Sequence, residues 1–226
     1  MFAAQVRLGA SVIDGFYGKA DRLESMADYA LARMPPTAAI LGHSMGARVA
    51  LEIVRRAPHR LTRLALVDTG IHPVRAGEEI GRYRLRDLGF AQGAAALADA
   101  WLPPMLAEDS RRDGALMDTL REMVIAAGPT VFARQIEALL HRPAVEQLLP
   151  TIAGPTLVAV GSEDMWSPPE QHEAITRLLP DGHLRVIAGA GHMAPAERPE
   201  AFNEIVRDWL SWPARSGETE AEAQKG

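Results

Sequence analysis

The chain has 226 residues, 47% of them hydrophobic, which is enough for one domain with a buried core and tight for two. Its 24 basic and 29 acidic residues give a net charge of -5 without a run of Lys or Arg that could follow a phosphate backbone, so nucleic acid is not an expected partner. The absence of cysteine excludes disulfides, thiolate metal sites and cysteine nucleophiles, and it is compatible with a reducing cytoplasm.

The N-terminal segment, residues 1–16, does not have the pattern of a signal peptide, because Arg7 and Asp14 interrupt its short apolar stretch. No run approaches the roughly 20 apolar residues that cross a bilayer. We therefore expect a soluble, cytoplasmic protein that has no membrane partner.

Over the first seventy residues, short apolar runs alternate with helical patterns, which is typical of a parallel sheet covered by helices. Strands are predicted at residues 10–13, 38–41 and 64–67. A helix is predicted at residues 45–57, where apolar side chains recur at helical spacing and Pro58 follows.

From residue 71 to residue 150 the patterns become helical, which predicts an inserted helical cap. Strands return at residues 156–160 and 184–187, and a helix is expected from Pro199. The expected organisation is therefore an α/β core formed by residues 1–70 and 151–212, a helical cap at 71–150, and a polar, disordered tail at 213–226.

The motif Gly42-His43-Ser44-Met45-Gly46 lies between a predicted strand and a predicted helix, which is the setting that G-x-S-x-G requires. Ser44 would occupy a strained turn that only glycine at positions 42 and 46 permits, with its hydroxyl exposed as a nucleophile. The Met45 amide, at the start of the helix, is the expected oxyanion donor. His43, beside the nucleophile, is expected to pack behind this turn or to shape the substrate pocket rather than to act as the base.

Asp164 directly follows the predicted strand at 156–160, and in a parallel sheet such positions gather in the crevice where ligands bind. It is the candidate that orients a histidine, with Glu163 and Asp68 as open alternatives. Trp166, two residues further, is a candidate pocket residue.

His192 follows the predicted strand at 184–187 in the sequence Gly189-Ala190-Gly191-His192, where the glycines let a loop carry the imidazole over the strand ends. It is the candidate base. The remaining histidines other than His43 have no comparable setting and are expected on the surface or in the packing: His59, His72, His141, His172 and His183. No two histidines have a metal-ligand spacing such as i, i+4, so neither a metal nor a cofactor is expected.

Three motifs in the order Ser, Asp, His give the chain its resemblance to the α/β-hydrolase superfamily, close to the small esterases typified by pimeloyl-carrier-protein methyl ester esterase. The resemblance covers about residues 10–210 and is carried by LGHSMGARVALEIVRRAP, LALVDTG, PTLVAVGSEDMWSPPE and GAGHMAPAERPEAFN. It implies cleavage of a small acyl ester through an acyl-enzyme on Ser44, with His192 as base and Asp164 holding that histidine. A thioesterase, a carbon-carbon hydrolase or a lyase could use the same residues.

The resemblance also implies N-terminal strands that this sequence lacks, including the one whose following loop donates the first oxyanion amide. We expect Met1 to be an internal methionine with such a strand encoded upstream; the alternative is a truncated, non-catalytic binding protein. One missing oxyanion donor lowers the rate by about 100- to 1000-fold. The sheet is predicted to contain a gap unless residues 10–13 pair directly with residues 38–41.

Overall fold

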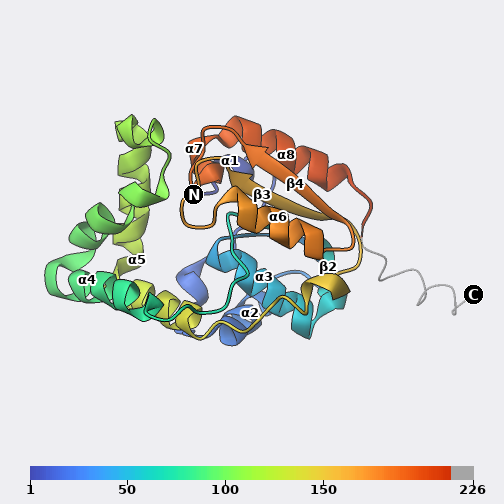
Figure 1. Cartoon of the computed structure of the whole chain (residues 1–226), viewed down its shortest axis with the longest axis horizontal. Helices are drawn as coiled ribbons and strands as arrows, with labels where there is room; N and C mark the ends of the chain where they lie inside the picture. The colour runs from blue at the N-terminus through green and yellow to red at the C-terminus, as the bar shows by residue number, and fades with distance from the viewer. Residues whose placement is uncertain (215–226) are drawn as a thin grey trace, which may run out of the picture.

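A computed structural model describes residues 1–214 as a parallel sheet with helices on both faces and a helical layer beside it (Figure 1). Most of the tail predicted at 213–226 lies outside these described residues. The strands are β1 (Ala38–His43), β2 (Leu61–Val67), β3 (Thr156–Gly161) and β4 (Gly182–Ile187).

The four strands pair in chain order, β1-β2-β3-β4, and every pairing is parallel. β3 is buried along its whole length, as its apolar sequence TLVAVG predicts for a central parallel strand. The prediction of a strand at residues 10–13 is wrong, because this segment has no regular structure and pairs with none of the strands within residues 1–214. β1 therefore forms an edge of the sheet in the described residues, with β2 as its partner.

Alternate strand residues point into two apolar layers, as the two-residue period of a strand requires. Leu64, Leu66 and Val158 pack with α2 (Leu23–Leu31), α3 (Met45–Arg56) and α6 (Pro169–Leu178). Ala65, Val67, Leu157 and Ala159 pack against α8 (Pro199–Ser211) on the other face. In Figure 1, α8, α7 (Ala194–Glu197) and α1 (Ala3–Val6) lie above the sheet, and α2 and α3 lie below it.

Residues 71–150 contain no strand, and two long helices, α4 (Glu78–Trp101) and α5 (Gly114–Leu140), pack against each other beside the core (Figure 1). Both helices bend at a glycine with positive φ: Gly93 at 90° and Gly128, just before Pro129, at 75°. The remaining short 3₁₀ turns are Gly15–Tyr17, Pro58–Arg60, Pro103–Met105, Ser110–Arg112 and Leu149–Thr151.

By length and composition alone, α5 is long and apolar enough to cross a bilayer. The expectation that no run in the sequence approaches this length is corrected on this point. The break at Gly128 and Pro129 divides α5 into two shorter helices packed on α4, which is the geometry of a cap rather than of one straight span.

Candidate active site

Ser44 lies in a sharp turn between β1 and α3, with φ 53° and ψ -117°. This positive φ is a strained conformation for a residue with a side chain. The turn needs glycine at position 42, because a Cβ there would collide with the backbone of Gly46 and Ala47. The same expectation for Gly46 is wrong, since a Cβ there would meet only the Tyr17 hydroxyl oxygen at 3.7 Å.

The turn places the Ser44 hydroxyl beside the first amide of α3. The Ser44 N–H continues the sheet by donating to the Val67 carbonyl oxygen at 2.8 Å. The Met45 N–H is the first amide of the helix and has no acceptor among residues 1–214. A free amide at a helix N-terminus is suited to hold an oxyanion.

The loop after β4 carries His192 to this turn. His192 Nε2 lies 2.8 Å from Ser44 Oγ, and its Nδ1 lies 2.8 Å from Asp164 Oδ2. The three predicted residues thus form one hydrogen-bonded chain. Such a chain allows an imidazole to take the hydroxyl proton while a carboxylate holds its other nitrogen.

Asp164 is buried in the loop after β3, and four donors surround its carboxylate. Oδ1 accepts from the Trp166 and Ser167 amides at 2.8 and 3.0 Å, and Oδ2 accepts from the Ser167 hydroxyl at 3.0 Å as well as from His192. Burial raises the pKa of Asp164, but the hydrogen bond and charge of His192 outweigh it, so the pKa is lowered from its ordinary value. Asp164 is therefore ionised at neutral pH.

The pKa of His192 is raised above its ordinary value. Burial lowers it, and the hydrogen bond and negative charge of Asp164 more than offset that effect. The side chain is 6% exposed, so water screens this pair little. An imidazole of raised basicity is suited to accept a proton from Ser44.

A second histidine, His43, holds the backbone of the first. Its Nε2 donates to the His192 carbonyl oxygen at 2.6 Å, and the Asp68 carboxylate lies 3.5 Å from the same nitrogen. Asp68 is fully buried; its Oδ1 accepts from the Gly161 amide at 2.9 Å, and its Oδ2 has no hydrogen-bond partner among residues 1–214. His43 also lines the cleft, so it both borders the site and anchors the loop of His192.

The cleft in front of Ser44 has a volume of about 1370 Å³. It is larger than the roughly 300–1000 Å³ of most ligand sites because it continues along the unpaired edge of β1. On the cap side the cleft is lined by apolar side chains, among them Trp101, Met105, Met123 and Phe132. Met117 packs beside Leu120 and Met105 instead.

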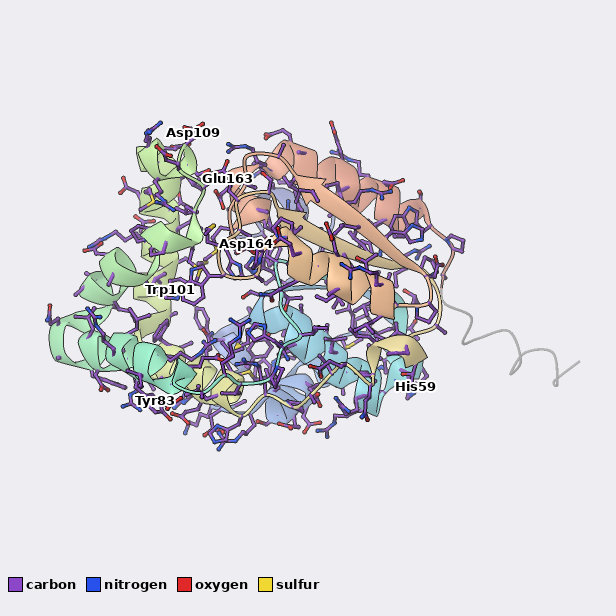
Figure 2. All side chains as sticks on the ribbon, viewed as in Figure 1. His59, Tyr83, Trp101, Asp109, Glu163 and Asp164 are labelled. Carbon is purple, nitrogen blue, oxygen red and sulfur yellow. The ribbon has the colours of Figure 1, made fainter. Side chains whose placement is uncertain are left out.

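Trp166 lines this cleft and is 40% exposed, with its ring centroid 6.5 Å from that of His192. Figure 2 shows Trp101 on the cap side and Asp164 on the core side of the space between them. The cleft is therefore bounded by aromatic side chains from both parts of the chain.

The alternative acids have other partners. The exposed Glu163 carboxylate accepts from the Glu108 amide at 3.3 Å, and Asp68 faces His43 rather than His192 Nδ1. Among the remaining histidines, His59 lies far from the cap (Figure 2). His172 is fully buried, and its Nε2 accepts from the Thr69 amide at 2.8 Å.

Two residues that the sequence did not indicate support the site. Ser167 bonds Asp164 through its hydroxyl, as described above. Glu197 Oε1 accepts from the Gly191 and Met193 amides on either side of His192, both at 3.0 Å, and its Oε2 accepts from the Ala107 amide of the cap at 2.9 Å. The only sequence signal for Glu197 is an acid in the otherwise apolar run that follows His192.

Within residues 1–214, no three His, Asp or Glu side chains converge on a position that could hold a metal ion.

A family model described as "Alpha/beta hydrolase family" matches residues 7–205. The chain belongs to this family. The fold class predicted from the sequence, with its parallel sheet, flanking helices and hydrolase resemblance, is thereby confirmed. Within this family, the chain is similar to several curated proteins and solved structures.

Two curated relatives are each 27% identical to the chain. One is "Putative carbamate hydrolase RutD" of Yersinia enterocolitica, where the match covers 89% of this chain and 73% of the relative. The other is "Pimeloyl-[acyl-carrier protein] methyl ester esterase" of Neisseria meningitidis, with 83% and 75% covered. The solved structure of a thermophilic esterase from Thermogutta terrifontis, malate bound, superposes with a TM-score of 0.78 at 31% identity, covering 84% of this chain and 72% of that one. The chain is therefore a hydrolase-family member similar to esterases.

Proposed function

We propose that this protein hydrolyses small carboxylic esters, with Ser44 as nucleophile, His192 as general base and acid, and Asp164 as the carboxylate that orients His192. The observation that carries the proposal is the continuous chain from Ser44 Oγ to His192 Nε2 and from His192 Nδ1 to Asp164, with both links at 2.8 Å. The similarity to esterases supports the reaction class.

In the first half of the proposed reaction, Ser44 Oγ attacks the ester carbonyl carbon while His192 Nε2 takes the hydroxyl proton. The negative charge that develops on the carbonyl oxygen is met by the free Met45 amide and the N-terminus of α3. His192 then returns its proton to the departing alkoxide, the carbon-oxygen bond breaks, and an acyl ester on Ser44 remains.

In the second half, His192 removes a proton from water, and the resulting hydroxide attacks the acyl carbon. The second tetrahedral intermediate collapses, Ser44 regains its proton from His192, and a carboxylic acid leaves. Whenever His192 is neutral, Asp164 keeps it in the tautomer that has hydrogen on Nδ1, so that Nε2 is free to accept.

The cleft suits an acyl group that is mostly apolar. Trp166 and Trp101 border it from the two parts of the chain, and Met105, Met123 and Phe132 complete the cap side. Trp166 and His43 are proposed to contact the substrate, Trp166 through its exposed ring and His43 from beside the nucleophile.

The test is to incubate the protein with a fluorophosphonate probe and to locate the adduct by mass spectrometry. We expect one adduct on Ser44 that is absent in Ser44→Ala and strongly reduced in His192→Ala, because unassisted serine is a weak nucleophile. A matched control is Ser162→Ala, which removes a serine hydroxyl from the loop after β3 that donates to none of the three residues.

Turnover of 4-nitrophenyl esters of graded chain length then reports the reaction itself. A folded protein that neither labels at Ser44 nor turns over any of these esters would refute the esterase proposal. That result would favour the non-catalytic alternative. Labelling at Ser44 without turnover of any ester would contradict the ester substrate and would favour a thioesterase, a carbon-carbon hydrolase or a lyase that uses the same residues.

A further inference from the structure

A cluster of arginines lies where the cap joins the core and lines the same cleft as Ser44. Arg48 belongs to α3, Arg142 follows α5, and Arg82 lies in the first turns of α4. Among the described residues 1–214, the one carboxylate that binds members of this cluster directly is Glu78, at the start of α4.

The guanidinium of Arg142 is fully bonded and holds together this junction of cap and core. Its side chain is 2% exposed, and its two Nη atoms lie 2.7 Å from the two Glu78 carboxylate oxygens. It also donates to the carbonyl oxygens of His72, Pro73 and Leu139. The negative charge of Glu78 is thereby neutralised by its arginine partners. Burial raises its pKa, but the hydrogen bonds from Arg142 and Arg82 outweigh this and lower the pKa to about 2.

Arg48 is different, because part of its guanidinium has no acceptor within residues 1–214. The residue is 4% exposed; Nη2 donates to the His72 carbonyl oxygen at 3.0 Å, and Nη1 is buried without a hydrogen-bond partner in that part of the chain. A buried charged donor without an acceptor is costly, and native proteins seldom retain one unless something else binds there.

The charges around Arg48 leave a positive excess. Three guanidiniums (Arg48, Arg82 and Arg142) face two nearby carboxylates (Glu78 and Glu146). Burial and the charge of Arg142 lower the pKa of Arg48 to about 10, so it remains charged at neutral pH but less favourably than in water. An anion bound at Nη1 would offset both the desolvation and the repulsion from Arg142.

The position of Arg48 relative to Ser44 indicates which kind of anion could bind to it. Arg48 follows Ser44 by four residues, about one turn or roughly 6 Å along α3, on the wall of the same cleft. A group bound at Nη1 could therefore be the far end of an acyl chain attached at Ser44. A free N–H donor on Nη1 suits a carboxylate oxygen, which a guanidinium binds more tightly than a neutral acceptor.

We propose that Arg48 forms a carboxylate subsite, and that the preferred substrates are esters whose acyl chain ends in a free carboxylate. This inference rests on the proposed esterase function and specifies its substrate class. Arg142 and Glu78 are positioning residues here, because they hold the His72 carbonyl that fixes the Arg48 guanidinium.

The kinetic experiment compares matched pairs of substrates: mono-4-nitrophenyl esters of dicarboxylic acids from succinic to suberic acid, and the same compounds with the free end capped as a primary amide. We expect kcat/KM for the acid to exceed that for the amide at one or two chain lengths. Arg48→Met should reduce this acid-to-amide ratio by about 10- to 100-fold, the value of a charge-assisted hydrogen bond.

Three controls isolate the charge effect. Arg48→Met should lower kcat/KM for the amide-capped ester much less than for the acid, because the amide loses a hydrogen bond to a neutral acceptor and the acid loses a charge-assisted one. Arg48→Lys should give an intermediate ratio, since an ammonium is a point charge. Arg56→Met, an exposed arginine of the same helix outside the cleft, should change nothing.

Binding separates this inference from the proposed function. Isothermal titration calorimetry with free dicarboxylates should show affinity in the wild type and a 10-fold or larger loss in Arg48→Met. If no ester is hydrolysed but this Arg48-dependent binding is found, the esterase proposal fails and the carboxylate subsite stands. Equal rates for acid and amide, or a ratio and an affinity unaffected by a folded Arg48→Met or Arg48→Lys protein, would overturn the subsite.

Discussion

Replacing Asp164 with asparagine is the substitution whose effect the structure defines most sharply. Oδ1 accepts from two backbone amides, those of Trp166 and Ser167, so the asparagine will keep its carbonyl oxygen there. Its amide nitrogen must then occupy the place of Oδ2, 2.8 Å from His192 Nδ1. Because that nitrogen is a donor, it forces Nδ1 to become an acceptor and moves the ring hydrogen to Nε2.

The consequence is a histidine that faces Ser44 with a hydrogen instead of a lone pair. Such a tautomer cannot take the serine proton, and in serine proteases the equivalent change lowers kcat by about 10⁴. We expect a loss of about 10³–10⁴ in kcat, or about 4–5.5 kcal/mol of transition-state stabilisation. KM should change little, since Asp164 does not line the cleft.

The assay is steady-state hydrolysis of a 4-nitrophenyl ester by Asp164→Asn and by two matched variants, Glu163→Gln and Asp68→Asn. Glu163 is exposed and bonded to the cap, so its variant should stay within about threefold of the wild type. Asp68→Asn keeps an oxygen for the Gly161 amide and should lose less than about tenfold. A large loss in Asp68→Asn together with a small one in Asp164→Asn would refute the assignment of the acid.

Three further predictions concern the same site. Since the pKa of His192 is raised and the base must be neutral, kcat/KM should fall as pH drops through a midpoint above 6.5, and in Asp164→Asn the midpoint of the residual activity should shift down. Glu197→Gln replaces one of two accepting carboxylate oxygens by an NH2 group that can only donate. Either the amides around His192 or the Ala107 amide then lose their acceptor, and the free energy of unfolding should fall by about 1–3 kcal/mol in urea denaturation. Gly42→Ala should lower the melting temperature by several degrees or prevent folding, whereas Gly46→Ala should lie within about 1 kcal/mol of the wild type; equal effects would contradict the account of the turn.

The elements that the sequence predicted well are those whose signal is local. The strands ending at His43, Val67, Gly161 and Ile187 are apolar runs between turn residues, and α3 has an apolar face at helical spacing. The segment at residues 10–13 carries a similar short apolar run and forms no strand, because a strand exists only where another strand supplies its hydrogen bonds. A short run of this kind cannot reveal its partner.

The same distinction applies to the site. Ser44, Asp164 and His192 were recognisable because each stands in a motif directly after a predicted strand, and the structure brings all three within hydrogen-bond distance. Arg48 and Glu197 were not recognisable from the sequence, because their roles depend on contacts with residues far away in the chain. A buried guanidinium looks the same in sequence as an exposed one, and only the fold shows that Arg48 Nη1 has no partner in the described part of the chain, residues 1–214.

The backbone around His192 is held from two sides, and this links the cap to the proposed chemistry. His43, at the end of β1, binds the His192 carbonyl oxygen, while the His192 amide donates to the Met105 carbonyl oxygen of the cap at 2.7 Å. Glu197 adds a second link by joining the loop of His192 to the Ala107 amide. A cap displaced by even a fraction of an ångström would move the imidazole relative to Ser44 Oγ, and proton transfer is sensitive to that distance. The segment around residues 103–107 should therefore influence kcat as well as KM, which a cap that merely covers the cleft would not do.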